Sequence, residues 1–356
     1  MESVDVLVVG AGLAGLAAAR DLTNAGRSVL VLEKSRGVGG RAATKRLDLN
    51  PAGVVRADHG AQFFTARSER FQTLIAHLSK LGIVREWTRG FPKLGPNGLD
   101  QRSPGNPRYV CPPGMSSLGK AIQGGLGNEV SVNVEYAATV AAIKQTSHGW
   151  TAVLENGQER HGRTLVVNAP APQAQQLLES HLNQDRIEAL SKVRSDPCWA
   201  VIAALETRPD PGWNGLEIED PTLAWAALDH TKRDAESPPV LVLHATPAWS
   251  LEHLEETPEA VLEPLLNAAQ GLLGDWVGNR LAAIAHRWRY ALPTVTFPEA
   301  FLAQKTMVAC GDWCAPAGGP TGRGSPRIET ALQSGWASAK HLNEMLEREP
   351  TPSSGD

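Results

Sequence analysis

The sequence predicts an α/β fold in which a doubly wound domain with a parallel sheet is joined to a second domain with a mainly antiparallel sheet. Three observations favour this class. The Val-rich run Val4–Val9 leads through glycines into a helical pattern and a second apolar run, which together form a strand–helix–strand unit. Longer strand patterns fill residues 199–290. A short apolar run and a long helical pattern follow, from Met307 to Leu346.

Length and composition limit the class of protein. The 356 residues favour about two domains, and 42% hydrophobic with 20% charged residues is an ordinary globular balance. The net charge of −4 offers no strong attraction for nucleic acid or anionic lipid, so we expect neither as a partner. We expect a cytoplasmic protein, because no secretory signal is evident and no apolar stretch reaches the ~18 residues of a membrane span. The four scattered cysteines are expected to be reduced thiols.

The elements of the first half follow from apolar spacing and from turn residues. Val4–Val9 is continuously apolar, as in a buried parallel strand, and Leu13–Ala25 has helical spacing and stops at Gly26. Ser28–Leu32 is the second buried strand. Further on we expect helices at 71–81 and 115–122, a surface loop at the Pro- and Gly-rich residues 92–107, a hairpin at 140–153 and a buried strand at 165–167.

The second half carries longer strand patterns. We expect strands at 200–205, 223–228, 240–245 and 281–290, with one helix at 260–273. Met307–Cys310 is again a short apolar strand, and Ser325-Pro326 supplies an N-cap and a first-turn proline for a final helix to Leu346. Gly335 and Ala339 lie one turn apart and are expected to let this helix pack closely on the sheet. The polar tail 348–356 is expected to be disordered.

A glycine motif, Gly10-x-Gly12-x-x-Gly15, stands between the first strand and the first helix. Gly10 permits the tight turn, Gly12 lets the backbone approach a pyrophosphate, and Gly15 lets helix and strand pack closely. Glu33 ends the second strand near the ~20-residue offset of an acid that binds ribose hydroxyls. The motif predicts a Rossmann-like site for NAD or for the adenosine of FAD, because a carboxylate at Glu33 would repel a 2′-phosphate.

A second glycine run decides between these two ligands. Gly37-Val38-Gly39-Gly40-Arg41 begins where a simple dehydrogenase would begin its next helix. Flexible glycines allow a second backbone approach to the diphosphate, and Arg41 can add a charge-assisted hydrogen bond. An ordinary Gly-rich loop with a solvated arginine is the alternative interpretation. With the first motif, this run favours FAD as the cofactor.

These motifs resemble the FAD-dependent amine oxidase superfamily. The resemblance rests on Gly10–Gly15, on Glu33–Arg41 and on Asp58-His59-Gly60-Ala61-Gln62-Phe63-Phe64. Within the superfamily the sequence is most similar to the renalase-type branch, as indicated by Thr44-Lys45-Arg46, Gly114-Met115-Ser116-Ser117-Leu118 and His286-Arg287-Trp288-Arg289-Tyr290. The sequence departs from the family at 315–324, a Gly- and Pro-rich insert where the usual link to the last helix is shorter.

The resemblance implies a discontinuous FAD domain and gives roles to further residues. It implies that Asp312 contacts the ribityl hydroxyls or phosphates, that the backbone at Val140 holds the adenine, and that His59 lies beside the flavin. We expect the FAD domain to comprise 1–60, 108–170 and 300–347, and the substrate domain to comprise 61–107 and 171–299. The residues expected to hold FAD are Gly10, Gly12, Leu13, Ala14, Gly15, Glu33, Lys34, Gly39, Gly40, Arg41, His59, Gly60, Ala61, Gln62, Val140, Asn168, Gly311, Asp312, Arg327 and Ile328.

Aromatic and basic residues supply the candidates for the substrate side. The candidate catalytic residues are His59, His244, Trp288, Arg289 and Tyr290, and Gln62 and Trp225 are further candidates. Alternation along the last strand of the second domain puts His286, Trp288 and Tyr290 on one face and Arg287 and Arg289 on the other. Core tryptophans and solvated arginines are the alternative interpretation. We find no Ser/His/Asp or Cys/His arrangement and no metal-ligand cluster in the sequence.

Three functions compete. The resemblance implies a renalase-like oxidase that takes a hydride from NAD(P)H isomers reduced at ring carbon 2 or 6, with dioxygen reduced to hydrogen peroxide. Such a reaction needs positioning more than a base. A flavin amine oxidase is the second interpretation, although its usual aromatic cage of tyrosines has few candidates here. A non-catalytic FAD-binding protein is the third. We expect a small-molecule substrate, dioxygen as its co-substrate, and a monomer or homodimer.

Overall fold

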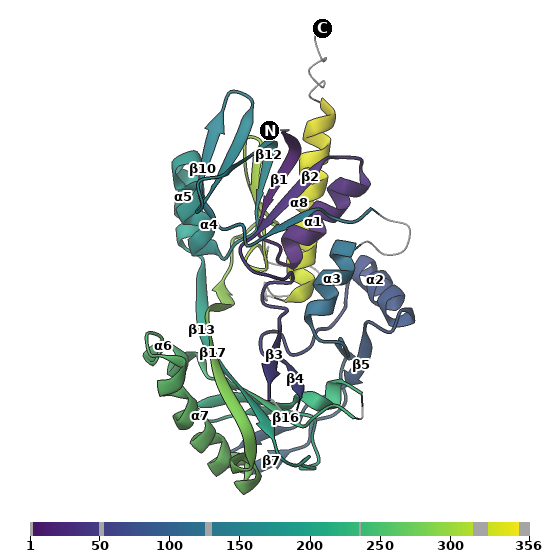
Figure 1. Cartoon of the computed structure of the whole chain (residues 1–356), viewed down its shortest axis with the longest axis vertical. Helices are drawn as coiled ribbons and strands as arrows, with labels where there is room; N and C mark the ends of the chain where they lie inside the picture. Colours follow the sequence, from purple (N-terminus) through teal and green to yellow (C-terminus); the bar gives the residue numbers. More distant parts are fainter. Residues whose placement is uncertain (1–2, 50–52, 125–129, 235, 316–326, 349–356) are drawn as a thin grey trace. The chain divides into compact units, whose positions relative to one another are not determined.

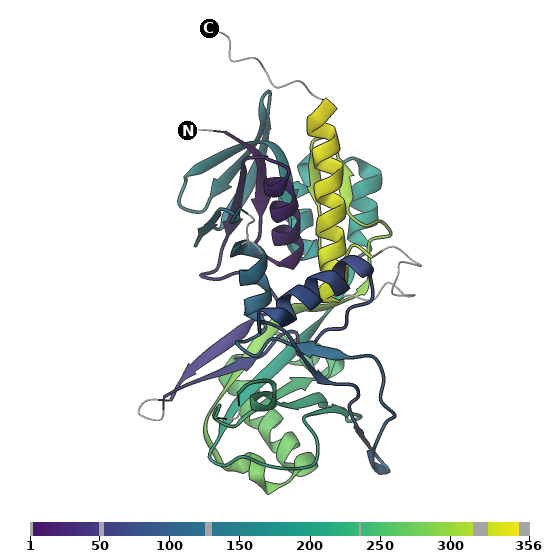
Figure 2. The same cartoon turned by 90° about the vertical axis from the view of Figure 1, so that its right-hand side faces the viewer.

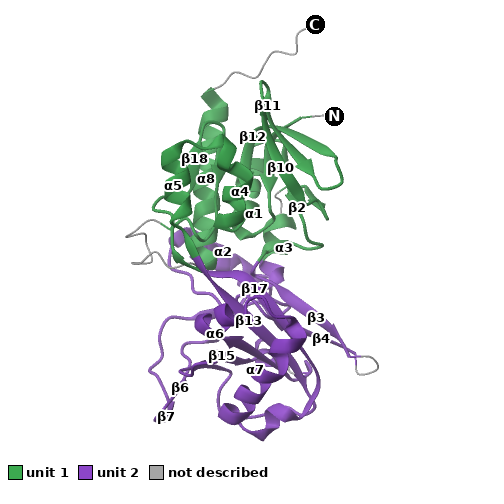
Figure 3. Cartoon of the chain, turned by 90° about the vertical axis from the view of Figure 1, so that its left-hand side faces the viewer, with its two compact units in different colours: residues 1–40, 119–194, 293–356 green, residues 41–118, 195–292 purple. Residues whose placement is uncertain are grey.

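A computed structural model describes residues 3–49, 53–124, 130–234, 236–315 and 327–348. The chain forms two compact units, each made of separate segments (Figure 3). Unit 1 comprises Met1–Gly40, Gly119–Arg194 and Pro293–Asp356, and unit 2 comprises Arg41–Leu118 and Ser195–Leu292. These bounds differ from the predicted ones. Residues 41–60 and 108–118 lie in unit 2, and residues 171–194 and 293–299 lie in unit 1.

Unit 1 is built on an eight-stranded sheet with a parallel centre. Its path runs β10-β11-β12-β1-β2-β9, and β19 continues it by pairing with β12 and β18. Strand β1 is parallel to both β12 and β2, and β12 is parallel to β19. Strands from the beginning and the end of the chain therefore share one sheet, as the sequence predicts. The bounds are β1 Val4–Val9, β2 Val29–Glu33, β9 Val134–Tyr136, β10 Val140–Thr146, β11 Gly149–Leu154, β12 Glu159–Val167, β18 Leu302–Gln304 and β19 Met307–Ala309.

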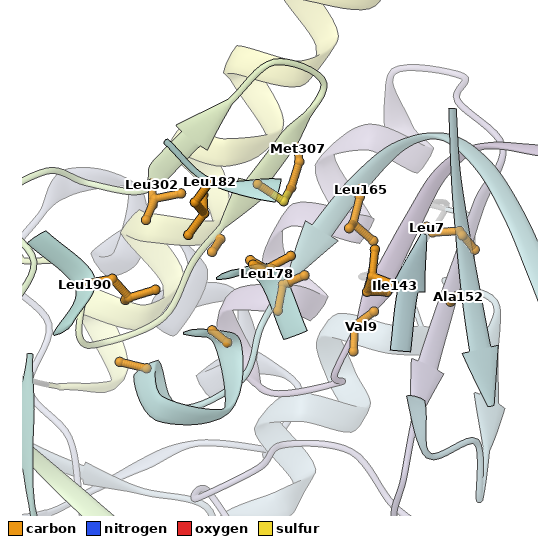
Figure 4. Packing of buried hydrophobic residues seen from close by; sticks show 14 of the residues in the cluster. Leu7, Val9, Ile143, Ala152, Leu165, Leu178, Leu182, Leu190, Leu302 and Met307 are labelled. Carbon is orange, nitrogen blue, oxygen red and sulfur yellow. The ribbon is translucent and has the colours of Figure 1, made fainter. Parts of the chain in front are cut away.

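Helices cover both faces of this sheet (Figure 1). On one face α4 (Ala171–Leu178) and α5 (Gln184–Ser191) join a buried cluster with alternate residues of the strands, among them Leu7, Val9 and Leu165 (Figure 4). A short 3-10 turn, η1 (Glu179–His181), links these two helices. This double covering explains why the central strands are apolar on both faces and read as unbroken hydrophobic runs.

On the other face α1 (Leu13–Asn24) and α8 (Ile328–Arg348) lie side by side (Figure 2). A Cβ at Gly335 would overlap the carbonyl oxygen of Ala14 and lie 2.9 Å from the Cβ of Ala17. Gly335 therefore sets the close approach of α8 to α1. The sequence predicted that Gly335 packs on the sheet, but its contacts are with α1, which lies in the same layer as α8.

Unit 2 is built on a seven-stranded sheet in the order β17-β13-β16-β15-β14-β6-β7. Strands β13, β16, β15 and β14 pair antiparallel, whereas β14 and β6 are parallel. The sheet contains β6 (Lys93–Gly95) and β7 (Gly98–Asp100), which form a hairpin inside the segment predicted as a loop. Three-residue strands around a Pro-Asn-Gly turn are too short to show alternation. The other bounds are β13 Arg194–Leu205, β14 Gly215–Ile218, β15 Leu223–Leu228, β16 Val240–Ala245 and β17 Arg280–Val295.

The two faces of this sheet have different covers. Helices α6 (Pro247–Glu252) and α7 (Pro258–Leu273) pack on the face that carries Leu241, Leu243 and Ala245 of β16. On the opposite face the ribbon of β3 (Thr44–Asp48) and β4 (Val54–Asp58) packs against Val240 and Val242. Because side chains alternate along a strand, His244 points to the ribbon face. That face carries the polar residues described below.

The remaining elements are short. They are α2 (Glu69–Lys80), β5 (Arg85–Thr88), β8 (Arg108–Val110), α3 (Ser116–Gly124), η2 (Asp229–Lys232) and η3 (Asp275–Gly278). All four cysteines are free thiols, and burial raises the pKa of Cys111, Cys198 and Cys310 to about 12. These thiols are therefore protonated at neutral pH. Within the described ranges, no helix is long and apolar enough to cross a membrane.

Candidate functional site

The first glycine motif of unit 1 forms a tight turn that only glycine fits. Gly10 has a φ of +96°, and a Cβ there would overlap the carbonyl oxygen of Asn168. A Cβ at Gly15 would overlap the carbonyl oxygen of Gly10. Gly12 is the N-cap of α1 and brings no side chain to the first-turn N–H groups, which include those of the buried Leu13 and Ala14. The positive end of the helix dipole is left for an anion.

Glu33 and Asn168 border this turn. The Glu33 carboxylate is buried and accepts hydrogen bonds from the backbone N–H of Ala11 at 2.7 Å and of Ser35 at 2.8 Å. It thus fixes the turn as well as ending β2. Asn168 donates from its backbone N–H to Val9 and from its Nδ2 to the Cys310 carbonyl, at 2.7 and 2.9 Å. Its buried Oδ1 has no hydrogen-bond partner among the described residues.

The second glycine run lies directly on the first. Gly39 and Gly40 have φ values of +110° and +58°, which glycine adopts without strain. The backbone N–H of Gly39 donates to the Ala11 carbonyl at 2.8 Å, and a Cβ at Gly40 would lie 3.3 Å from the Cα of Gly12. The two runs therefore form one backbone-lined cradle in unit 1. Arg41 belongs to unit 2, where its guanidinium donates to the Ala291 carbonyl at 3.0 Å.

The other unit 1 residues predicted to hold the cofactor occupy varied positions. Gly311 follows β19 and donates from its N–H to Ser334 Oγ at 3.1 Å, and Asp312 beside it is partly exposed. Lys34 is exposed, Val140 opens β10, Arg327 is partly exposed, and Ile328 begins α8. Ser325, Pro326 and the insert beyond Ala315 lie outside the described residues.

The cradle fits the diphosphate and ribose of a dinucleotide. It offers backbone N–H groups at a helix N-terminus whose first turn holds no acidic residue. It offers the buried Glu33 carboxylate and the orphan Asn168 Oδ1 as acceptors for hydroxyl groups. Side chains at Gly10, Gly12 or Gly15 would collide with Asn168 or with the backbone of Gly10, so the cradle keeps its shape only with glycine there. These features agree with FAD as the expected ligand.

Three aromatic rings of unit 2 gather around His59. The centroid of the His59 ring lies 4.7 Å from that of His286 and 5.1 Å from that of Trp288, and the last two are 4.6 Å apart. The carbonyl oxygen of His59 accepts hydrogen bonds from Trp288 Nε1 at 2.9 Å and from His244 Nε2 at 3.1 Å. Because a carbonyl only accepts, the hydrogen of neutral His244 is on Nε2. We call His59, His244, His286 and Trp288 the aromatic cluster.

Gln62 and its neighbours lie next to the aromatic cluster. Gln62 Nε2 donates to the carbonyl of Asp58 and, at 3.2 Å, to that of Gly60, and it lies 3.4 Å from His244 Nε2. Gln62 Oε1 accepts from Trp225 Nε1 at 3.4 Å. Ala61 donates from its N–H to the Arg41 carbonyl at 3.0 Å, and a Cβ at Gly60 would overlap that same carbonyl oxygen. The 58–62 loop is therefore tightly held.

The structure also shows four buried charges, of which only Asp58 was named from the sequence, as part of the family motif. Lys232 bonds Asp229 at 2.9 Å, and Arg233 bonds Asp229 at 2.6 Å and Asp58 at 3.2 Å. Lys232, Asp229 and Asp58 are fully buried. We call these four residues the charge cluster. Asp229, Lys232 and Arg233 follow the end of β15 and look like a solvated turn, whereas Asp58 is the last residue of β4. Only their partners across the fold identify these charges as interior.

Burial and nearby charge shift the protonation of both clusters. Burial, with the nearby His286 and Lys45, lowers the pKa of His59 from 6.5 to about 3. Burial, with Lys232 adding to it, lowers the pKa of His244 from 6.5 to about 4. Burial also lowers the pKa of His286. Burial and Asp229 raise the pKa of Asp58. The imidazoles of His59 and His244 are therefore neutral at pH 7.

The structure does not bring every candidate to the aromatic cluster. Arg289 lies on the opposite face of β17 and makes two hydrogen bonds to the exposed Glu255, at 2.7 and 2.8 Å. Arg289 was a candidate because it follows Trp288 in the sequence, but adjacent residues of a strand point to opposite faces of the sheet. Tyr290 follows Trp288 on the same face by alternation and is partly buried.

Comparison with known proteins decides the family. The sequence model of the NAD(P)-binding Rossmann-like domain matches residues 8–78, and the model of the flavin containing amine oxidoreductases matches residues 98–343, more than half of the chain. The chain belongs to the flavin containing amine oxidoreductase family. It is thus a member of a family of FAD-dependent oxidoreductases, and its cofactor is FAD.

Individual members of this family share short segments with the chain. (S)-6-hydroxynicotine oxidase of Paenarthrobacter nicotinovorans is 38% identical over 104 residues, which are 28% of this chain and 24% of that protein. Putrescine oxidase of Kocuria rosea is 61% identical over 44 residues, which are 12% of this chain and 9% of that protein. These matches span a quarter or less of the relatives' own length.

Solved structures of amine oxidoreductases share the whole fold. Cyclohexylamine oxidase from Brevibacterium oxydans aligns with a TM-score of 0.73 at 14% identity, over 98% of this chain and 100% of that one. Putrescine oxidase bound to putrescine aligns with a TM-score of 0.68 at 14% identity, over 96% and 99% of the two chains. The described part of this chain holds no group of three or more His, Cys, Asp or Glu residues suited to a metal ion.

The lowered histidine pKa values predict that the protein loses stability in acid. Unfolded histidines bind protons near pH 6.5, whereas folded His59 and His244 do so only near 3 and 4. The unfolded state therefore holds more protons in this window, and each histidine costs up to about 1.4 kcal/mol of stability per pH unit as pH falls. Thermal unfolding monitored by circular dichroism should show that Tm falls as the pH is lowered from 6.5 towards about 4. His244→Gln should make that slope shallower, and the exposed His148→Gln should not; equal slopes in both variants would contradict the shift.

Proposed function

We propose that this protein is a renalase-like FAD-dependent oxidase of dihydronicotinamide dinucleotides reduced at ring carbon 2 or 6. The substrate would lose one hydride and become NAD(P)+. Dioxygen would accept the two electrons, and with one further proton it would leave as hydrogen peroxide. Bound FAD supplies the acceptor for the hydride and passes its electrons on to dioxygen.

The observation that carries this proposal is the uncharged, aromatic character of the cluster around His59. The imidazoles of His59 and His244 are neutral at pH 7, and the carboxylates of Asp58 and Asp229 next to the cluster are paired with Lys232 and Arg233. A neutral, flat ring fits such a surface, whereas an ammonium would lack an ionised acid as its partner. The hydride leaves as the ring regains aromaticity, so the protein needs to orient the ring and to exclude water.

The protein's own residues would do the positioning. The His59 carbonyl holds the Trp288 indole and the His244 imidazole by hydrogen bonds, so the three rings keep a fixed arrangement. His244 carries its hydrogen on Nε2, and its Nδ1 lone pair is therefore an acceptor at neutral pH. Such an acceptor suits a substrate N–H group, for example the carboxamide of a nicotinamide ring.

Oxidation of an amine is the second candidate function. The names of the relatives favour it, since hydroxynicotine, putrescine and cyclohexylamine oxidases are among them. The indoles of Trp225 and Trp288 could replace the tyrosines of an aromatic cage. Both functions require the same cofactor, so the substrate alone distinguishes them.

A turnover assay with peroxide detection tests the proposal. The isomers of dihydro-NAD reduced at carbon 2 and 6 should give a kcat/KM at least about 100-fold above those of putrescine, benzylamine and ordinary NADH, which is reduced at carbon 4. The position of the reduced carbon decides whether its hydride is aligned with the flavin. Release of NAD+ in equal amount to hydrogen peroxide confirms the balance. Turnover of an amine without response to the isomers would support the amine oxidase, and no turnover at all would support a non-catalytic FAD-binding protein.

A further inference from the structure

Lys232 is a buried ammonium that the reaction as described does not use. Its side chain is fully buried, and its Nζ donates to Asp229 Oδ1 and to Gln62 Oε1, each at 2.9 Å. The ammonium also lies 5.0 Å from the centroid of the Trp87 ring. Taking a lysine out of water is costly, and well-packed apolar residues often stabilise a core at least as well as a buried ion pair. The position of the ammonium therefore points to a role beyond stability.

The contact with Lys232 fixes which way the Gln62 amide faces. An ammonium has three donors and no acceptor, so the amide must turn its oxygen to Lys232. The indole N–H of Trp225 also points at that oxygen. The amide NH2 group is then directed at the carbonyls of Asp58 and Gly60. A flipped amide would set oxygen against two carbonyl oxygens and NH2 against the ammonium.

The two carbonyls held by Gln62 flank His59. The backbone of His59 presents the one carbonyl that accepts from both Trp288 Nε1 and His244 Nε2. A shift of the 58–60 backbone would release both rings and would remove the partner that keeps the hydrogen of His244 on Nε2. The path from Lys232 to the aromatic cluster thus runs through the Gln62 amide, the backbone of residues 58–60 and the His59 carbonyl.

We propose that Lys232 is a positioning residue that orients Gln62 and, through the His59 carbonyl, fixes the tautomer of His244 and the placement of Trp288. Asp229 holds the ammonium in place and is itself held by Arg233 and by the backbone N–H of Asp58 at 3.2 Å. The two acids and two bases balance in charge, which lowers the cost of holding these groups in the interior. The kinetic consequence of this role rests on the proposed function, but its structural consequence does not.

The first test follows histidine rather than activity. Holoenzyme labelled with 15N-histidine should give one set of imidazole signals for His244, assigned with His244→Gln and typical of the Nε2–H tautomer. Lys232→Met should split or shift these signals towards a tautomer mixture and leave those of the exposed His148 in place. The matched control is Lys93→Met, which breaks an exposed ion pair with Glu219 in the same unit. It should change none of them.

The second test is a double-mutant cycle on the rate of flavin reduction by the carbon-6 isomer of dihydro-NAD. Lys232→Met and Gln62→Leu should each slow reduction about 10- to 100-fold with FAD content retained, and the double variant should be no slower than the slower single variant. Effects that multiply would overturn the proposal. A lower Tm with unchanged rate and unchanged His244 signals would also overturn it, since Lys232 would then serve stability alone.

Folding of the variants does not decide the outcome. Should Lys232→Met fail to fold, Gln62→Leu still keeps the ion pairs of Lys232 and Arg233 with Asp229. It must reproduce the change in the His244 signals, and an unchanged spectrum overturns the proposal. A wild-type flavin that no dihydronicotinamide reduces contradicts the proposed function, and the histidine signals still determine the role of Lys232.

Discussion

Gly12→Val should purify with less than about a tenth of the wild-type FAD content, because the backbone at this position must approach the diphosphate. A Cβ at Gly12 would lie only 2.6 Å from Asn168 Oδ1, so the larger valine side chain would displace the turn or Asn168. Flavin absorbance per chain after denaturation measures the content.

Gly37→Val is the matched control for that substitution. Gly37 lies in the same unit and close to the second glycine run, but a Cβ there would meet nothing within 4 Å. Its FAD content should stay close to that of the wild type. An equal loss in both variants would indicate general damage to unit 1, and a full FAD content in Gly12→Val would contradict the cradle.

Trp288→Leu should slow reduction of the flavin by substrate about 100-fold with FAD content unchanged, because a misplaced ring loses alignment for hydride transfer. The substitution removes the indole N–H that bonds the His59 carbonyl and the ring that packs on His59 and His286. Rapid mixing of the variant with substrate in the absence of dioxygen measures the rate.

Arg289→Ala tests the same strand from its other face. The Arg289 side chain pairs with an exposed glutamate, and exposed pairs contribute little because solvent screens them. Its reduction rate should stay within about twofold of the wild type. A large loss in Arg289→Ala, or none in Trp288→Leu, would contradict the assignment of the aromatic cluster as the substrate site.

Much of unit 1 could be predicted from local sequence rules. Buried parallel strands are apolar on both faces, and the turn at Gly10 needs glycine for steric reasons that hold in any fold with this motif. The short apolar run at Met307–Ala309 predicted a strand, and the family resemblance implied its return to this sheet. The role of Gly335 was not predictable, because helix–helix contacts depend on which helices share a layer.

The substrate side was harder to predict because its interactions are long-range. Asp58, Asp229 and Lys232 are far apart in sequence or stand in a polar turn, and charges in such segments are usually solvated. Only the ion pairs and hydrogen bonds of the fold reveal that they are interior. Alternation along β17 correctly separated Trp288 from Arg289, but it gave no information on which face carries the chemistry.

Anaerobic single-turnover reduction of the bound flavin tests the central claim most directly. The purified holoenzyme is mixed in a stopped-flow instrument with the carbon-2 or carbon-6 isomer of dihydro-NAD, with ordinary NADH, or with putrescine. We predict that at least one of the two isomers bleaches the flavin absorbance in a single rapid phase and yields NAD+. This phase should be at least about 100-fold faster than with NADH or the amine. Bleaching by putrescine with no response to either isomer would contradict the account.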